Sequence, residues 1–179
     1  MALIFETITP ELVDWIGRQR MFFVATAPLS AEGHVNCSPK GLDTFRILGP
    51  RSVAYIDLTG SGIETAAHLR ENGRIVLMFC AFDGPPRIVR LHGRGNVLMP
   101  GETEFENLQK QFPDCAGVRC LIHIEVTRIS DACGYGVPLF EFVGNRTRLP
   151  ESLAAKGDAA LMKYRQAKNA VSVDGLTGI

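Results

Sequence analysis

The sequence lacks an excess of charge of either sign, a long apolar run and a secretion signal. Nineteen Lys and Arg residues balance nineteen Asp and Glu residues, whereas a general nucleic-acid binder needs a basic excess. The longest apolar run, residues 75–82, is far shorter than the roughly 20 residues that span a bilayer. The N-terminus also lacks the basic-then-apolar pattern of a signal peptide. We therefore expect a cytoplasmic protein with no membrane or nucleic-acid partner.

The sequence is also poor in the patterns that mark disulfide, zinc and serine-hydrolase chemistry. It has five cysteines, an odd number, and no CxxC pair, so we expect reduced, mostly buried thiols. The spacing of Cys115, Cys120 and His123 matches none of the usual zinc patterns, and no metal site is predicted. Ser61 lies in Thr-Gly-Ser-Gly rather than G-x-S-x-G, which argues against a serine hydrolase.

Length and composition predict a single domain over residues 1–179, with residues 150–179 as a C-terminal helical extension. Hydrophobic residues make up 46% and charged residues 21% of the 179 positions, which is ordinary for a globular chain. A chain of this size buries roughly 70% of the surface that its unfolded form exposes, so it needs no covalent staples.

Local signals predict several helices. Thr9, Pro10 and Glu11 provide an N-cap hydroxyl, a proline at the first helical position and an acid in the first turn. This helix is expected to end near Gly17. Further helices are predicted over residues 62–72, 102–112 and 152–169.

Strand patterns outnumber helical ones and follow one another in hairpin order. In the segment 120–126 apolar residues alternate with polar ones, which predicts a strand with one wet face. Hairpin order with few helices between strands favours a mainly β protein and an antiparallel barrel. The remaining strands are expected over residues 21–27, 34–38, 45–48, 52–58, 74–82 and 87–99.

A strand, a Gly/Ser/Thr loop and a helix start follow one another over residues 57–65. Glycines let backbone N–H groups approach a ligand closely, and the helix N-terminus after them favours an anion. Thr59, Ser61 and Thr65 add hydroxyl groups. The loop is neither a Walker loop nor a GxGxxG fingerprint, so it predicts either phosphate binding or a plain helix start with a flexible lead-in.

Two other segments carry cations. Lys40 stands between Pro39 and Gly41 at a strand end, where it can serve the glycine loop or be a solvated surface lysine. Farther along, Arg90, His92 and Arg94 share one strand face. That face predicts either a solvated surface or an anionic partner, such as the acidic helix over residues 102–112 or a ligand.

A glycine-flanked tyrosine, Tyr135, follows the strand of residues 120–126. A ring between two glycines can lie against a flat ligand, or the segment can be a plain turn.

Taken together, these segments resemble the pyridoxamine 5′-phosphate oxidase-like family of flavin-binding split barrels. The residues that carry the resemblance are 35–41, 54–65 leading into 68–72, and 87–95, and the match in order and spacing covers roughly residues 10–130. The resemblance implies a six-stranded antiparallel split barrel, a homodimer, and FMN bound in clefts at the dimer interface.

The resemblance also implies roles for individual residues toward FMN. Lys40 would face the phosphate, residues 57–61 would line the ring edge and ribityl chain, and residues 63–65 would close the phosphate loop. Arg90 or Arg94 would add a cation, and Tyr135 would come from the other subunit. The implied cofactor-binding residues are Ser38, Lys40, Asp57, Leu58, Thr59, Ser61, Ile63, Glu64, Thr65, Arg90, Arg94 and Tyr135.

The sequence also departs from the true oxidases of this family. Ile63, Glu64 and Thr65 stand where those enzymes have a serine-arginine-lysine trio, and their terminal arginine segment has no counterpart. We therefore do not predict oxidation of pyridoxamine phosphate. The expectation is an FMN-binding protein, an oxidoreductase with unassigned catalytic residues. The alternatives are a non-catalytic flavin store or sensor and a relative that binds haem or a deazaflavin.

Overall fold

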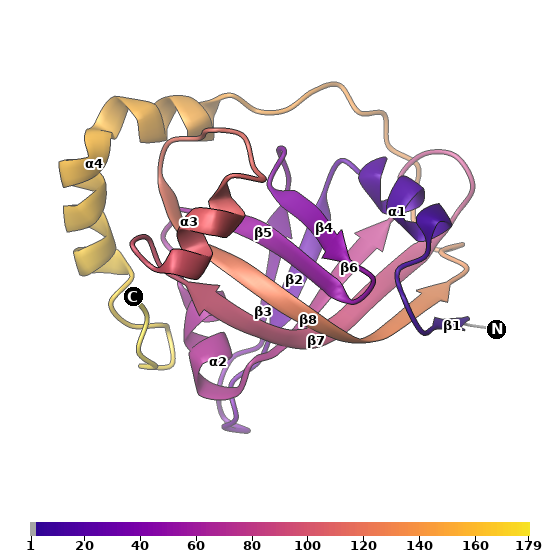
Figure 1. The fold of residues 1–179 in the computed structure, drawn as a ribbon, viewed down its shortest axis with the longest axis horizontal. Helices are drawn as coiled ribbons and strands as arrows, with labels where there is room; N and C mark the ends of the chain where they lie inside the picture. Colours follow the sequence, from indigo (N-terminus) through magenta and orange to yellow (C-terminus); the bar gives the residue numbers. More distant parts are fainter. Residues whose placement is uncertain (1–2) are drawn as a thin grey trace.

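The computed structural model describes residues 3–179, and its backbone is dominated by one antiparallel sheet (Figure 1). The sheet order is β3-β2-β6-β7-β8-β5-β4, and β1 pairs with β8. The mainly β, antiparallel prediction is therefore confirmed. The strands are β1 Ile4–Phe5, β2 Phe22–Thr26, β3 Asn36–Lys40, β4 Phe45–Gly49, β5 Ser52–Leu58, β6 Arg74–Cys80, β7 Ile88–Leu98 and β8 Val118–Ala132.

The sheet has eight strands where six were expected, and across residues 3–179 its end strands, β3 and β4, are not paired with each other. It curls strongly because β7 and β8 are long and their register shifts between His92 and Gly93. A Cβ on Gly93 would overlap the carbonyl oxygen of Glu125. Only glycine allows β7 and β8 to approach this closely at the bulge.

Four helices flank the sheet, and local sequence signals account for their ends. In α1 (Pro10–Gly17) the Thr9 hydroxyl accepts a hydrogen bond from the Leu12 N–H at 3.3 Å, so the predicted cap and end are confirmed. Helix α2 (Glu64–Asn72) ends at Gly73, which has φ +70°. The others are α3 (Thr103–Gln109) and α4 (Arg148–Lys168), and α4 kinks at Gly157. Across residues 3–179, no helix is long and apolar enough to cross a membrane.

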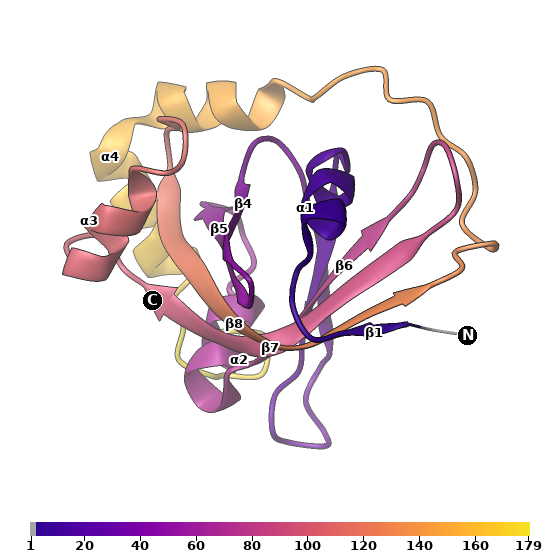
Figure 2. The same cartoon turned by 45° about the vertical axis from the view of Figure 1, so that its right-hand side comes forward.

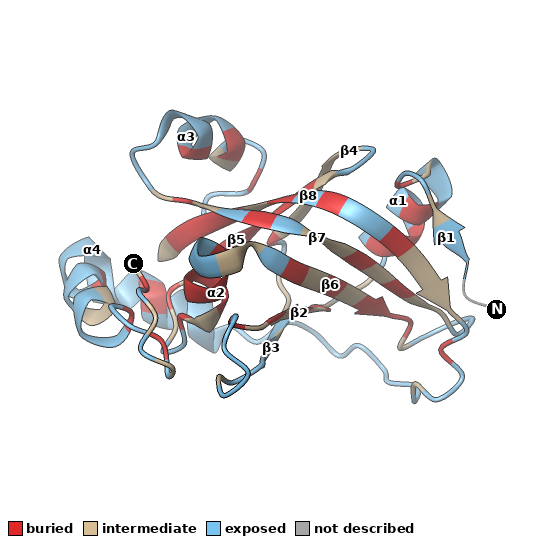
Figure 3. Ribbon diagram, turned by 90° about the horizontal axis from the view of Figure 1, so that it is seen from below, coloured by how far each residue is buried: buried red, intermediate tan, exposed pale blue. Residues whose placement is uncertain are grey.

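The main hydrophobic core fills the inside of the curl. It joins side chains from α1, such as Leu12 and Trp15, to strand residues such as Val24, Leu77 and Ile122. A second cluster lies between α3 and the outer faces of β5 and β8. Buried and exposed positions alternate along the central strands in Figure 3, as expected for strands covered on one face.

The wet face predicted for β8 is confirmed, because His123 is half-buried and Glu125 and Thr127 are exposed between buried apolar residues. Two local predictions need correction. Two of the five cysteines are buried, so the expectation of mostly buried thiols is wrong. The acidic helix does not face the arginines of β7, because Glu104 of α3 pairs with His123 of β8 at 3.0 Å.

Candidate functional site

The carboxylate of Asp57, near the end of β5, forms a buried ion cluster with Lys40 and Arg119. Its Oδ1 accepts a hydrogen bond from Lys40 Nζ at 2.8 Å, and its Oδ2 accepts from Arg119 Nη2 and Nε at 2.5 and 3.0 Å. Asp57 is 1% exposed and Arg119 is 4% exposed. Because β3 and β5 are not neighbours in the sheet, the Lys40–Asp57 bond spans the opening of the curl.

The cluster keeps Asp57 ionised despite its burial. Burial alone would raise the pKa of Asp57, but the positive charges of Lys40 and Arg119 outweigh burial and hold this pKa below its usual value. Burial and the Asp57 charge both raise the pKa of Cys120, which keeps this thiol protonated and unreactive. The Lys40 ammonium also lies 6.0 Å from the centre of the Tyr55 ring.

A small polar pocket of about 150 Å³ opens beside this cluster, between β3, the end of β5 and the start of α2. Its hydroxyl and amide groups form one network. Asn36 Nδ2 donates to the Thr65 hydroxyl at 2.9 Å and to the Thr26 hydroxyl at 3.2 Å, while Ser38 donates to Asn36 Oδ1 at 3.1 Å. Thr65 accepts from Asn36, so its own hydroxyl proton can be donated to a second partner.

Two side chains, Arg119 and Asn169, bind the carbonyl groups of the glycine loop. Arg119 Nη1 donates to the carbonyl oxygens of Gly62 at 2.7 Å and Gly60 at 3.3 Å. Asn169 Nδ2 donates to those of Gly60 at 3.0 Å and Ser61 at 3.3 Å. In a trans peptide the N–H points opposite to the preceding C=O. The N–H groups of Ser61, Gly62 and Ile63 therefore face away from these donors and have no acceptor within residues 3–179.

The C-terminal helix fixes the same loop from behind. Arg165, near the end of α4, donates to the Thr59 hydroxyl at 2.9 Å and to the Val118 carbonyl at 2.9 Å. The Thr59 hydroxyl in turn donates to the carbonyl of Gly117 at 2.8 Å. Because its hydroxyl is engaged in these hydrogen bonds, Thr59 stabilises the conformation of the loop.

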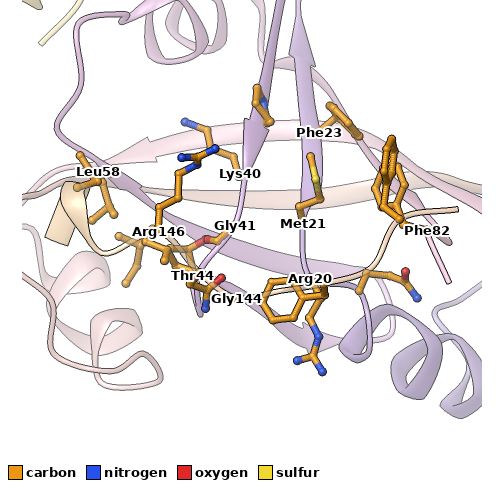
Figure 4. Close-up of a pocket in the computed structure, with 18 of the residues that line it drawn as sticks. Arg20, Met21, Phe23, Lys40, Gly41, Thr44, Leu58, Phe82, Gly144 and Arg146 are labelled. Carbon is orange, nitrogen blue, oxygen red and sulfur yellow. The ribbon is translucent and has the colours of Figure 1, made fainter. Parts of the chain in front are cut away.

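A larger cavity of about 890 Å³ adjoins the polar pocket, and Lys40, Leu58 and Gly60 line both (Figure 4). Its volume lies in the range of roughly 300–1,000 Å³ that small-molecule sites usually have. Its floor comes from the starts of β2 and β4 and the ends of β3 and β5. The apolar part of its lining includes Met21, Phe23, Ile56, Leu58, Phe82, Phe140, Phe142 and Leu149.

The roof of the cavity is an irregular segment, residues 134–147, which we call the strap. In Figures 1 and 2 the strap runs as an orange line over the molecule from the end of β8 to α4. It contributes Phe140, Phe142 and Arg146 to the cavity lining. The tertiary structure thus assigns the strap a binding surface that its irregular sequence does not predict.

The turn after β3 carries backbone strain at the cavity wall. Leu42 has φ +61°, a left-handed conformation that residues other than glycine rarely adopt. The Thr44 hydroxyl donates to the Gly41 carbonyl at 2.8 Å and holds this turn. Strain of this kind persists where the surrounding structure fixes the backbone, which is frequent at binding sites.

The structure brings together most of the site residues that the sequence predicts. Lys40, Leu58 and the others around the polar pocket converge, but Ser61 is exposed and Ile63 is 1% exposed in the interior. The predicted residues that line the polar pocket, the larger cavity or both are Ser38, Lys40, Asp57, Leu58, Thr59, Glu64 and Thr65.

The two arginines of β7 and the tyrosine of the strap do not join this site within the chain. Arg94 donates to the carbonyl of Asn72 at 2.6 Å, and so satisfies the C-terminus of α2. Arg90 lies on β7 opposite Met78 and Ser130, outside both cavities. Tyr135 is 81% exposed and lines neither of them.

Several site residues are absent from the sequence-based prediction. Arg119 has the clearest available signal, because it interrupts an apolar strand next to Cys120. Asn36 lies in a predicted strand, but its partners are 10 and 29 residues away. Arg146 and Asn169 come from segments whose position relative to the sheet no local pattern specifies.

Comparison with known proteins identifies relatives of this chain. The family model described as Pyridoxamine 5'-phosphate oxidase matches residues 8–133. The pyridoxamine 5'-phosphate oxidase family protein ustO of Aspergillus flavus is 38% identical over 198 aligned positions, which cover 100% of this chain and 78% of that protein. This alignment includes the strap and α4, which lie outside the family model.

Solved structures share the fold over most of the chain. HupZ from Group A Streptococcus is 24% identical, with a TM-score of 0.54 over 74% of this chain and 99% of that one. An FMN-binding protein from Syntrophomonas wolfei subsp. wolfei is 15% identical, with a TM-score of 0.50 over 68% of this chain and 86% of that one. Together with the match over residues 8–133 and the relative from A. flavus, these findings show that the chain belongs to the pyridoxamine 5'-phosphate oxidase family.

Proposed function

We propose that this chain binds FMN and acts as an FMN-dependent oxidoreductase. The observation that carries the proposal is the junction of the polar pocket with the apolar cavity at Lys40, Leu58 and Gly60. FMN needs an anion site, a polar track for its ribityl hydroxyls and a flat, partly apolar slot for its ring. The polar pocket suits the first two needs, and the cavity suits the third. Membership of a family with an FMN-binding structural relative supports the same choice.

The donor set of the polar pocket fits a phosphate group. Of the loop residues 61–63, whose N–H groups have no acceptor within residues 3–179, Gly62 lines the pocket. It precedes α2, whose first turn has no side-chain cap, and such a helix start favours an anion. The Thr65 hydroxyl and the Lys40 ammonium add a neutral and a charged donor. In this arrangement Lys40 faces the phosphate, and residues 57–61 follow the ribityl chain toward the cavity.

The charge balance of the pocket limits how strongly it attracts a dianion. Lys40 and Arg119 face the carboxylates of Asp57 and Glu64, so the four side chains have no net charge. Glu64 Oε2 lies only 2.6 Å from the point where a Cβ on Gly62 would be, so this carboxylate already folds over the loop. We expect backbone and hydroxyl donors to supply much of the phosphate binding, and Glu64 to oppose it.

The remaining predicted cofactor residues require a second copy of the chain. Arg90 and Tyr135 are remote from the pocket of their own chain but accessible to a partner. We propose a homodimer in which these residues complete the partner's site. A concentration-dependent loss of FMN on dilution would support this arrangement, whereas a monomer that retains FMN would contradict it.

Bound FMN supplies the hydride or electron transfer, and the chain binds and orients it. The Asp57 cluster holds Lys40 in place, and Arg119 and Asn169 hold the loop carbonyls away from the ligand. Because the Thr59 hydroxyl already donates to Gly117, a donor to the flavin must come from backbone N–H groups or from a cation such as Lys40.

The first test compares FMN with riboflavin, which lacks the phosphate. Lys40→Ala should weaken FMN binding about ten- to a hundredfold, since a charge-assisted hydrogen bond contributes roughly 1.5–3 kcal/mol. Riboflavin binding should change much less. Lys163→Ala, an exposed lysine on α4, is the matched control. Flavin fluorescence titration measures both ligands, and an unchanged FMN dissociation constant in Lys40→Ala would contradict the assignment.

Turnover is tested separately from binding. Mixing the FMN-loaded protein with NADH or NADPH in a stopped-flow instrument should bleach the flavin absorbance if the protein is an oxidoreductase. Absence of bleaching with either donor would favour a flavin store or sensor. The visible spectrum of the freshly purified protein distinguishes FMN from haem and from a deazaflavin.

A further inference from the structure

The strap closes a preformed chamber rather than lying loosely over the sheet. Gly134, with φ +67°, packs so closely on the residue before β7 that a Cβ would lie 2.8 Å from the Arg87 nitrogen. The Phe140 N–H donates to the Phe82 carbonyl at 2.8 Å, and the two rings lie 5.5 Å apart. The guanidinium of Arg20 lies 5.1 Å from the centre of the Phe142 ring. These contacts fix the roof of the cavity before any ligand enters.

The charges in this cavity are unevenly distributed. Lys40 is already bonded to Asp57, but Arg146 of the strap has no ion pair within residues 3–179. In Figure 4 the side chain of Arg146 extends toward Lys40, at the end of the cavity opposite Phe82. Asp83, a carboxylate of the lining, directly follows Phe82. Arg18, Arg20 and Glu141 also line the cavity, so its four cationic side chains outnumber its two carboxylates.

The walls between these ends are apolar and broad. Met21, Phe23 and Phe142 contribute side chains to them, and aromatic faces of this kind suit a flat ring. A guanidinium binds carboxylate through two parallel N–H bonds. Arg20 already lies over the Phe142 ring, so we assign the anion of a ligand to Arg146. A ligand with a flat apolar body and one carboxylate matches both features.

We propose that the cavity beneath the strap is a substrate subsite for an aromatic or similarly flat carboxylate, with Arg146 binding the carboxylate and Phe142 packing on the body. This inference rests on the proposed function in one respect, since the FMN ring would enter the cavity at the end that it shares with the polar pocket, and the substrate would lie beside that ring under the strap. The strap lies outside the part of the chain that the family model matches, residues 8–133. Part of the subsite is thus built by a segment that the family model does not cover.

The test uses 2-naphthoate as a fluorescent probe and its neutral amide, 2-naphthamide, as the matched ligand. Arg146→Gln should weaken naphthoate binding about tenfold, as expected for loss of a charge-assisted contact, and leave naphthamide binding unchanged. Arg148→Gln, an exposed arginine outside the cavity lining, should bind naphthoate as the unaltered chain does. Equal affinities in the two variants would overturn the role of Arg146.

A second pair of variants tests the apolar wall without changing charge. Phe142→Ala should weaken both probes by about the same factor, whereas Val143→Ala should change neither, because Val143 is 94% exposed and outside the lining. If Phe142→Ala binds both probes normally, or if neither probe binds at millimolar concentration, the subsite is not present. Circular dichroism of each variant shows whether it remains folded.

Titration with FMN separates this inference from the proposed function. Naphthoate should bind with similar affinity in the presence and absence of saturating FMN. If the two compete, the cavity holds the flavin ring alone and the separate subsite is refuted. If FMN does not bind but naphthoate binding still depends on Arg146, the cofactor proposal fails and the anion subsite remains.

Discussion

Replacing Asp57 with Asn should destabilise the protein far more than a single charge removed from the surface. Asp57 and Arg119 are almost fully buried, and two bonds join their side chains. Removing one partner of a buried pair typically costs about 3–5 kcal/mol, because the other charge stays buried without compensation. Arg119 keeps its bonds to the Gly60 and Gly62 carbonyls, and the new amide oxygen can still accept. We therefore expect the lower end of that range, about 3 kcal/mol.

Urea denaturation measures this loss. With a slope of about 2 kcal/mol per molar urea, the midpoint of unfolding should fall by about 1.5 M. The control is Asp43→Asn, which removes a carboxylate paired with Arg46 but 69% exposed at its side chain. A surface pair contributes about 0–1 kcal/mol, so this midpoint should move by less than about 0.5 M. The reasoning is refuted if the two variants lose the same stability at an unchanged slope.

Acid unfolding of the unaltered protein should reveal how much the same cluster contributes to stability. The pKa of Asp57 is lowered in the folded state, so its stabilising contribution is present above the ordinary carboxyl pKa of 3.8 and is lost as the pH falls through the lowered value. Asp57→Asn should therefore flatten the acid limb of the stability curve. A curve of unchanged shape would mean that Asp57 contributes little to acid unfolding.

Three further substitutions test the surroundings of the site. Glu64→Gln should tighten FMN binding about threefold, because a negative charge beside the phosphate is removed, and should leave riboflavin binding unchanged. Fluorescence titration measures both affinities, and weaker FMN binding would show that Glu64 assists phosphate binding. The hydrogen bond and charge of Asp174 raise the pKa of His34 above 6.5, and His34 lowers the pKa of Asp174 below 3.8. The amides of the C-terminal tail should therefore have higher protection factors against hydrogen exchange between these values than above the raised His34 pKa, and His34→Gln should abolish this difference. Gly178→Ala should lower Tm by about 5 °C, since the new Cβ would overlap the Asn169 carbonyl oxygen; an unchanged Tm in calorimetry would show that the tail relaxes freely.

The helix ends and strand pairs that depend on neighbouring residues can be predicted from the sequence. The start of α1 at Thr9 and Pro10 and the end of α2 at Gly73 are decided by local hydrogen bonding and backbone freedom. The antiparallel pairing of β2 with β3 follows from the turn composition of the loop between two strand patterns. In each case the physical cause acts within a few residues.

The positions of the site residues show where prediction from the local sequence fails. Lys40 and the glycine loop were expected to meet, and they do so across the polar pocket. The arginines of β7 were expected there too, but the strand register places Arg94 at the end of α2. Which strand ends meet depends on the curl of the whole sheet, because β2, β6, β7 and β8 all lie between β3 and β5 in the sheet order.

Residue patterns were sufficient to predict the mainly β, antiparallel class, the helix caps and the lysine and glycine segments that form the polar pocket. They could not predict that Asp57 and Arg119 occupy the interior beside Lys40, or that Arg146 and Asn169 reach the site from the C-terminal segment. The two sets of features differ in the sequence distance over which their physical causes act. Backbone hydrogen bonding and side-chain periodicity are set by near neighbours, whereas the partner of a buried charge is set by which distant strands the folded sheet brings together.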